Sequence, residues 1–235
     1  MRRALVGLVG AAAIAAAFAA PGGAANECRG ILVCISVPGP WVVVPARGEA
    51  TYLLECPRRR GVVGGVDALA TSRDVRVGFD ARIGSPVSPG TTTGRDAYFR
   101  GVSARHRRGA FQPYLGCIPA GGGGGRATTS ARVAARLQLA AIPPGPPFER
   151  RATTVKLGGA TVKTVVQGCA KGERLVGSWH ALAFRTKTAP NLIWTDYVRI
   201  ERTIRARHVV AQIVSSEGIP TVMQAEVQVG AVCAT

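Results

Sequence analysis

The feature that most constrains this chain is an internal repeat. The segment Thr51–Ala70 has a degenerate copy 113 positions later, at Thr164–Ala183. The alignment superposes Cys56 on Cys169, and it also superposes a Val-Gly step and an Ala-Leu-Ala step that follow in each copy. Repeated segments of this kind indicate repeated structural units. The sequence therefore predicts two related halves.

The spacing of the cysteines follows the repeat. Six cysteines, an even number, fit a protein of an oxidising compartment. Each half has one Cys in its repeated segment and one near its end, at a separation of 61 or 64 positions, and two more lie near the N-terminus. The repeat favours the disulfides Cys56–Cys117, Cys169–Cys233 and Cys28–Cys34. The alternative is that some of the six are free buried thiols.

The first 25 residues have the pattern of a signal peptide. Arg2-Arg3 is followed by the apolar run Ala4–Ala20, and small residues lead to an expected cleavage site near Asn26. The apolar run is short for a membrane span. We expect a secreted, extracellular mature chain with no transmembrane span, and the alternative is a leader that is kept as an anchor.

Gly121–Gly125 marks the predicted domain boundary, because five consecutive glycines are typical of a flexible linker. We expect a signal peptide over residues 1–25, a first domain over 28–119, a Gly-rich linker over 120–126 and a second domain over 127–235.

Short runs of β-branched and alternating residues separated by Gly and Pro predict an all-β fold. The candidate strands are residues 31–37, 41–44, 50–56, 62–66, 74–83, 97–104, 111–118, 151–157, 160–167, 174–184, 192–200, 209–214 and 223–233. Residues 128–142 fit a strand better than a helix, and Gly158-Gly159 predicts a tight hairpin. We therefore expect two tandem disulfide-linked β-sandwich-like domains after a cleaved signal peptide.

Glycines and alternation also predict local packing. Gly64-Gly65 inside a strand predicts a bulge, or close approach of a disulfide or a ring from the facing layer. In the last strand, the odd-numbered positions from Met223 to Cys233 share one apolar face, and Gln224, Glu226 and Gln228 share the other.

The segment Cys56–Gly65 resembles a Cys-Pro-x-Gly-x-x-Val-x-Gly-Gly segment of secreted, uncharacterised β-domains from GC-rich bacteria. This chain has Arg59 where that segment has Gly. The second copy keeps Gly172 and Gly177 but replaces the Pro by Ala170 and the last Gly by Ser178. The resemblance implies a β fold and export, and it implies no activity.

The chain is strongly basic, with 30 Lys and Arg against 13 Asp and Glu and a net charge of +17. Such a field attracts polyanions, although enrichment of Arg with Ala, Gly and Pro is also typical of GC-rich genomes. Two basic turns are the candidate anion-binding sites: Arg58, Arg59, Arg60, Arg105, Arg107 and Arg108. A second concentration of arginines comprises Arg199, Arg202, Arg205 and Arg207. An exported protein meets anionic envelope polymers first, so we expect no nucleic-acid partner.

No motif of the sequence predicts catalysis, a cofactor or a metal site. The three histidines form no zinc signature. Ser178 and His180 lie two positions apart on a strand, but no elbow glycine follows and no acid is placed to orient the His. The sequence therefore favours a non-catalytic secreted binding or structural module that associates with an anionic cell-envelope polymer. The alternatives are an extracellular protein-interaction domain pair and, less favoured, a Ser/His hydrolase.

Overall fold

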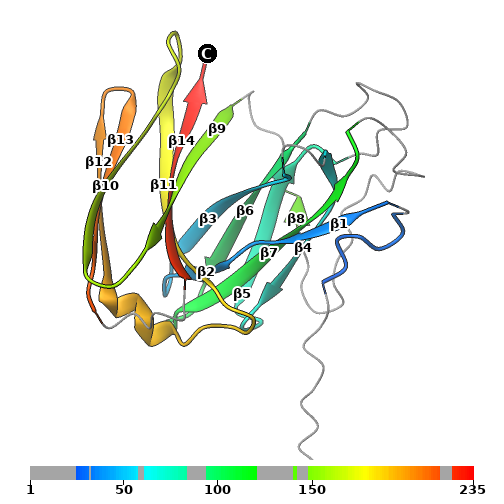
Figure 1. The fold of residues 1–235 in the computed structure, drawn as a ribbon, viewed down its shortest axis with the longest axis horizontal. Coiled ribbons are helices and arrows are strands. Elements are labelled where there is room, and N and C mark those ends of the chain that lie inside the picture. Colours follow the sequence, from blue (N-terminus) through cyan, green and yellow to red (C-terminus); the bar gives the residue numbers. More distant parts are fainter. Residues whose placement is uncertain are drawn as a thin grey trace, which may run out of the picture.

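A computed structural model describes residues 25–31, 33–57, 61–83, 94–120, 140–141, 148–217 and 224–235 (Figure 1). The fold is all-β, as predicted. Its elements are β1 (Ile35–Pro38), β2 (Trp41–Val44), β3 (Glu49–Glu55), β4 (Val62–Ala70), β5 (Val75–Ala81), β6 (Asp96–Ser103), β7 (Gly109–Ile118), β8 (Ala140–Ala141), β9 (Glu149–Leu157), β10 (Thr161–Gly168), β11 (Arg174–Arg185), the 3-10 helix η1 (Leu192–Tyr197), β12 (Val198–Arg205), β13 (His208–Ser215) and β14 (Gln224–Ala234).

One seven-stranded sheet runs through both halves of the chain. Its order is β1-β7-β2-β11-β14-β9, and β4 pairs with the other edge of β7. β1 and β2 pair with successive parts of β7, while β2 also pairs with β11. The central sheet is therefore built from the first half at one end and the second half at the other.

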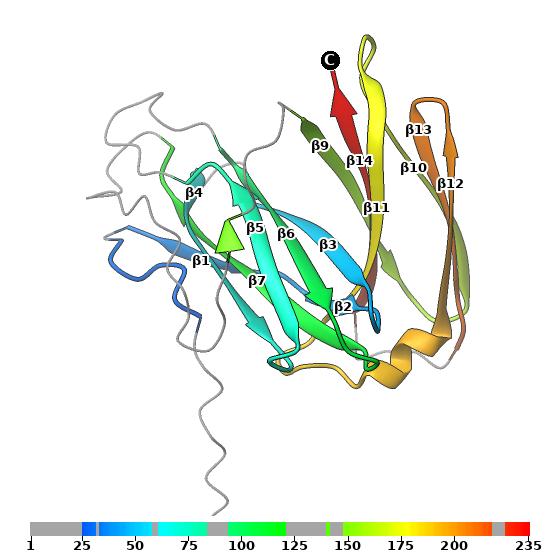
Figure 2. The ribbon, with the colours of Figure 1, turned by 180° about the vertical axis from the view of Figure 1, so that it is seen from behind.

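Two smaller sheets cover opposite ends of this central sheet (Figures 1 and 2). The sheet β3-β6-β5-β8 packs on the first half, and the sheet β10-β13-β12 packs on β11, β14 and β9. Each pair of layers encloses one hydrophobic core. Phe99, Phe111 and Leu115 are fully buried in the first, and Phe184 and Ile213 are fully buried in the second. The result is sandwich-like packing at both ends.

Strand β14 is buried on both faces. Ala225, Val227 and Val229 pack into the second core, as the alternation predicts. Glu226 and Gln228 on the other face are also buried, at 1% and 3% exposure, because they lie against strand β3 of the first half. The two halves thus share a polar interface in addition to a sheet.

The three disulfides are the ones that the repeat predicts. Cys28–Cys34, Cys56–Cys117 and Cys169–Cys233 are all formed, and no cysteine among the described residues is free. The two long bridges close loops of similar length, 61 and 64 residues, in the two halves.

The glycine prediction is confirmed in part. The pairing of β4 with β7 shifts register between Val63 and Gly65, which is the expected bulge. The neighbour of Gly65 differs from the prediction, because it is the backbone of the N-terminal loop: a Cβ on Gly65 would lie 2.0 Å from the carbonyl oxygen of Glu27.

Two local predictions are wrong. The first part of the predicted strand at residues 192–200 is η1, whose start is capped by the side chain of Asn191, which accepts from the N–H of Ile193 at 3.1 Å. The second concerns Gly158-Gly159, which joins two strands that do not pair with each other. β9 pairs with β14 and β10 pairs with β13, so the chain changes sheets at these glycines.

The predicted linker and most of residues 128–142 lie outside the described residues, so the domain division at 120–126 stays a prediction. β8 adds a short parallel strand to β5. Contacts also join the halves at the side-chain level, since Arg150 forms an ion pair of 2.6 Å with Asp80 and Tyr98 packs edge-on against Trp179 at 5.3 Å.

Candidate functional site

The central sheet splits beside strand β11, and this split forms a groove. β11 pairs with β14 along nearly its whole length, but with β2 it forms only the pairs Ala183–Val42 and Phe184–Trp41. Beyond these pairs β2 follows β7 and the chain turns at Pro45, so within the described chain no strand pairs with the edge of β11 before Ala183. Backbone polar groups at this edge are therefore open to other partners.

The groove encloses about 430 Å³ and has walls from both halves. β11 forms its floor, the corner between β2 and β3 forms one wall, and η1 with β12 forms the other. Its lining residues are Val43, Pro45, Glu49, Ala50, Thr51, Arg108, Ser178, Trp179, His180, Ala181, Leu182, Thr195, Ile200 and Arg202.

Two arginines line the groove, one of them ion-paired and the other without a carboxylate partner in the described chain. Arg108 from the first half donates to Asp196 at 2.6 Å and to the hydroxyl of Thr195 at 2.5 Å, so the β6–β7 turn is tied to η1. Arg202 from β12 donates to the backbone oxygen of Ser178 at 2.8 Å. Within the described chain Arg202 has no carboxylate partner, so its guanidinium is available to an anionic ligand.

His180 lies on the groove floor beside Arg202. The His180 side chain is exposed at the groove surface, but desolvation by the groove walls, followed by the positive charge of Arg202, lowers the pKa of His180 from its usual value. Both effects disfavour the charged imidazolium. His180 therefore lines the groove as a neutral donor and acceptor at neutral pH.

Ser178 and His180 line the same groove, as their spacing on a strand predicts. Among the described residues no hydrogen bond joins the Ser178 hydroxyl to His180, and none joins His180 to a carboxylate. Glu49, the acidic residue of the lining, is paired with Arg100. The geometry offers hydrogen-bonding groups and charge along one groove.

The predicted anion-binding residues divide into two groups. Arg58, Arg59 and Arg60 lie outside the described residues, so their role stays a prediction. The structure places Arg105, Arg107 and Arg108 in the turn between β6 and β7. Arg105 forms an ion pair of 2.8 Å with Asp74, which leaves Arg107 as the arginine of this turn without a carboxylate partner in the described part of the chain.

The structure brings Arg108 and Arg202 together, which the sequence did not predict. Each lies in an arginine concentration noted in the sequence, but the two are far apart along the chain. The remaining arginines of the second concentration are exposed, and Arg199 forms an ion pair of 2.5 Å with Glu201 beside a smaller hollow of about 350 Å³.

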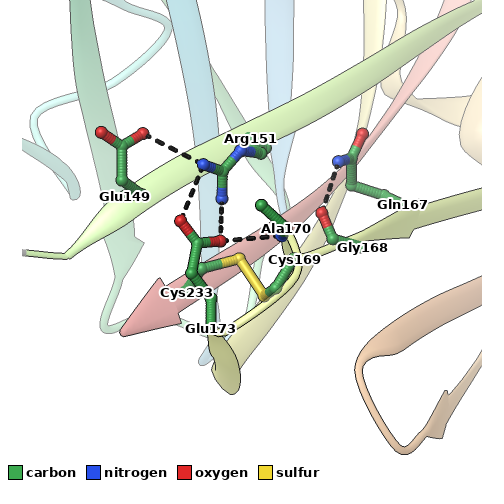
Figure 3. The surroundings of a disulfide bond; sticks show 8 residues. All are labelled: Glu149, Arg151, Gln167, Gly168, Cys169, Ala170, Glu173 and Cys233. Atoms are coloured by element: carbon green, nitrogen blue, oxygen red, sulfur yellow. Dashed lines mark hydrogen bonds and ion pairs between the residues drawn. A yellow bond between two sulfur atoms is a disulfide. The ribbon is translucent and has the colours of Figure 1, made fainter. Parts of the chain in front are cut away.

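A second cluster surrounds the Cys169–Cys233 disulfide (Figure 3). The Glu173 carboxylate accepts from Arg151 at 2.5 and 2.9 Å and from the N–H of Ala170 at 2.8 Å. These hydrogen bonds, those of Arg151 first, lower the pKa of Glu173. Cysteine binds a metal as the thiolate, and both sulfurs of this cluster are in the disulfide, so in the oxidised protein the cluster has no cysteine ligand and holds the turn to the sheet.

Comparisons with known proteins leave the family open. No protein-family model matches the chain, and no curated protein matches it. The resemblance of Cys56–Gly65 to secreted bacterial β-domains therefore stays a prediction. In the part of the chain that the structure describes, no helix is long and apolar enough to cross a membrane.

Proposed function

We propose that this protein is a secreted, non-catalytic module that binds an anionic cell-envelope polymer in the groove between its halves. The observation that carries the proposal is that Arg202, which has no carboxylate partner in the described chain, lies in one groove with Arg108 of the other half, which is ion-paired with Asp196. Guanidinium groups suit phosphate, carboxylate and sulfate, the anionic groups of such polymers.

Three properties support this assignment. The net charge, +17 for the whole chain and 17 − 2 = +15 without Arg2 and Arg3 of the leader, attracts polyanions. Arg202 lacks a carboxylate partner in the described chain, so a ligand does not have to break an ion pair to reach it. The unpaired edge of β11 adds backbone hydrogen-bonding groups along the groove, which suits an extended chain better than a small compact ligand.

The experiment compares attachment of the mature protein to purified envelope fractions at low and high salt. We expect attachment at low salt that salt reverses and that a soluble sulfated polysaccharide competes away, because screening weakens exposed charge pairs. Absence of attachment at low salt contradicts the proposal.

A protein-interaction function is the second candidate, and a specific surface favours it. On the outer face of β10 and β13, Val162, Val166 and Val214 are 67%, 56% and 40% exposed. Val162 and Val214 are direct cross-strand neighbours, so the exposed valines form a patch. This function predicts a protein partner whose association is insensitive to salt and is lost when Val162 and Val166 are changed to Thr.

A further inference from the structure

The loop from Asn26 to Cys34 is docked on the central sheet, where it precedes β1 as the dark blue segment of Figure 1. Its backbone lies so close to β4 and β7 that a Cβ on Gly65 or Gly116 would approach the carbonyl oxygen of Glu27 to 2.0 or 2.4 Å. The Cys28–Cys34 disulfide closes the loop. The two glycines leave room for the backbone of Glu27, and the disulfide restricts the conformations of the loop. Together they fix the position of the chain around residue 26.

The side chain of Asp67 binds the first residue of this loop. The backbone nitrogen of Asn26 donates to Asp67 Oδ2 at 2.6 Å, and the N–H of Ala68 donates to Asp67 Oδ1 at 2.7 Å. Asp67 is fully buried within β4. Residue 26 is also where the signal-peptide pattern places the new N-terminus.

A second buried acid lies in the same loop. Glu27 is 6% exposed and accepts a hydrogen bond from the hydroxyl of Ser36 through Oε1, while its Oε2 is buried and has no hydrogen-bond partner among the described residues. No ion pair within the described ranges involves Glu27 or Asp67. Buried carboxylates normally have a cationic partner, and this pair lacks one.

The pKa values of Asp67 and Tyr114 are raised, in agreement with buried negative charge that no cation balances among the described residues. Burial, opposed by the two backbone hydrogen bonds and assisted by the negative charge of Glu27, raises the pKa of Asp67. Burial and the charges of Glu27 and Asp67 also raise the pKa of Tyr114, which is the register partner of Asp67 on β7. A positive charge at residue 26 would relieve both effects.

We propose that the leader is cut between Ala25 and Asn26 and that the new α-ammonium of Asn26 forms a partly buried ion pair with Asp67. A processing endopeptidase catalyses the hydrolysis. Water breaks the amide bond, its oxygen goes to the carbonyl carbon of Ala25, and the released leader ends in a carboxylate. The Asn26 nitrogen becomes an ammonium. The cut takes place on the extended chain during export, before the loop docks.

Cleavage changes one neutral donor into a charged group with three donors. The ammonium supplies the cation that Asp67 lacks, and hydrogen bonds to charged groups are stronger than those between neutral ones. Only a chain that starts at residue 26 has its α-ammonium group next to Asp67, so removal of the leader stabilises the fold. This inference is independent of the groove and of its ligand.

The test compares two oxidised chains, one that begins at Asn26 and one that keeps Ala24 and Ala25, each with Asp67 or with Asp67→Asn. In denaturant titrations we expect the chain that begins at Asn26 to have an unfolding constant about tenfold lower. The difference disappears with Asp67→Asn. It persists with the matched control Asp74→Asn, since Asp74 is a partly exposed acid paired with Arg105. Equal stability of the two chains, or a difference that survives Asp67→Asn, overturns the proposal.

A second measurement applies even if Asp67→Asn does not fold. NMR titration of the α-amino group in the chain that begins at Asn26 should give a pKa above the ordinary ~8 for this group. Glu27 and Tyr114 are the other titratable groups that face the site, and in Glu27→Gln this pKa should stay above ~8, because Asp67 is the hydrogen-bond partner of the Asn26 nitrogen. An ordinary α-amino pKa, or an exported protein whose mass shows a different first residue, contradicts the assignment.

Discussion

The side-chain amide of Gln228 closes the edge of strand β3 at Leu53. The N–H of Leu53 donates to Gln228 Oε1 at 2.8 Å, and Gln228 Nε2 donates to the carbonyl oxygen of Leu53 at 3.0 Å. Both atoms of the amide are used, so a side chain from β14 takes the place of a neighbouring strand. This contact satisfies an edge that the fold buries between the halves.

Removal of this amide should be strongly destabilising. Gln228→Leu leaves the N–H and C=O of Leu53 buried without partners, and we expect a loss of about 2–4 kcal/mol in the free energy of unfolding. Denaturant titration measures it. The matched control is Gln212→Leu, at an exposed position on β13, which should change stability by less than about 0.5 kcal/mol. Equal effects of the two changes contradict this role of Gln228.

Because the pKa of Tyr52 is raised in the folded protein, we expect a loss of stability at alkaline pH. Its hydroxyl donates to Glu226 at 2.6 Å, and burial, followed by the negative charge of Glu226, raises the pKa of Tyr52 far above its usual value. Above pH ~10 the unfolded chain loses this proton and the folded chain keeps it, so stability falls by about 1.4 kcal/mol per pH unit from this group.

Tyr52→Phe should therefore make the alkaline decline shallower. Tyr114, whose pKa is raised by burial, keeps part of the slope. Tyr197→Phe, at a position 39% exposed, is the control and should keep the wild-type slope. Free energies of unfolding measured between pH 9 and 11 test this, and identical slopes for Tyr52→Phe and wild type would show that Tyr52 does not carry the effect.

The three disulfides should differ in their contributions. On the chain-entropy model, bridges that close loops of 61 and 64 residues stabilise by about 4 kcal/mol each, and the bridge across 6 residues by about 2 kcal/mol. We expect the double change of Cys56 and Cys117 to Ala to lower the denaturation midpoint about twice as far as that of Cys28 and Cys34. The reverse order contradicts this expectation.

His180 predicts a pH dependence of ligand binding. Desolvation in the groove and the charge of Arg202 lower the pKa of His180. The imidazole therefore becomes charged only at a pH below 6.5, the usual pKa of histidine. We expect affinity for dextran sulfate, whose charge is constant in this range, to rise from pH 7 to pH 5 by a larger factor in wild type than in His180→Gln. His208→Gln, exposed on β13, is the control. A rise in affinity of the same size in His180→Gln would show that His180 does not cause the pH dependence.

Local patterns predicted most of the strands and, where apolar and polar residues alternate, the face that is buried. The alternation in β14 identified Ala225 and Val227 as core residues, and the internal repeat identified the partners of Cys56 and Cys169. The error at Leu192–Tyr197 has a local cause, because its apolar and aromatic residues suit a strand. Asn191, a preferred residue at helix starts, was the available signal for the 3-10 helix.

The remaining features depend on contacts between distant residues. Glu226 and Gln228 are polar, and alternation alone places them on an outer face. They are buried because the first half covers that face, and nothing in their neighbourhood in the sequence reports this. The groove has the same origin, since Arg108 and Arg202 meet only through the joining of the halves by β2 and β11.

The central claim is that the groove binds an anionic polymer through Arg202. The most direct measurement is the dissociation constant for the envelope polymer at low salt for wild type, Arg202→Gln and Arg82→Gln. Glutamine keeps a donor for the backbone oxygen of Ser178. Arg82 is the control because it is exposed and follows the last residue of β5, at the end of that strand opposite to the β6–β7 turn. We predict about tenfold weaker binding for Arg202→Gln and less than about twofold for Arg82→Gln. Equal weakening by the two changes would show that the polymer responds to net charge and does not occupy the groove.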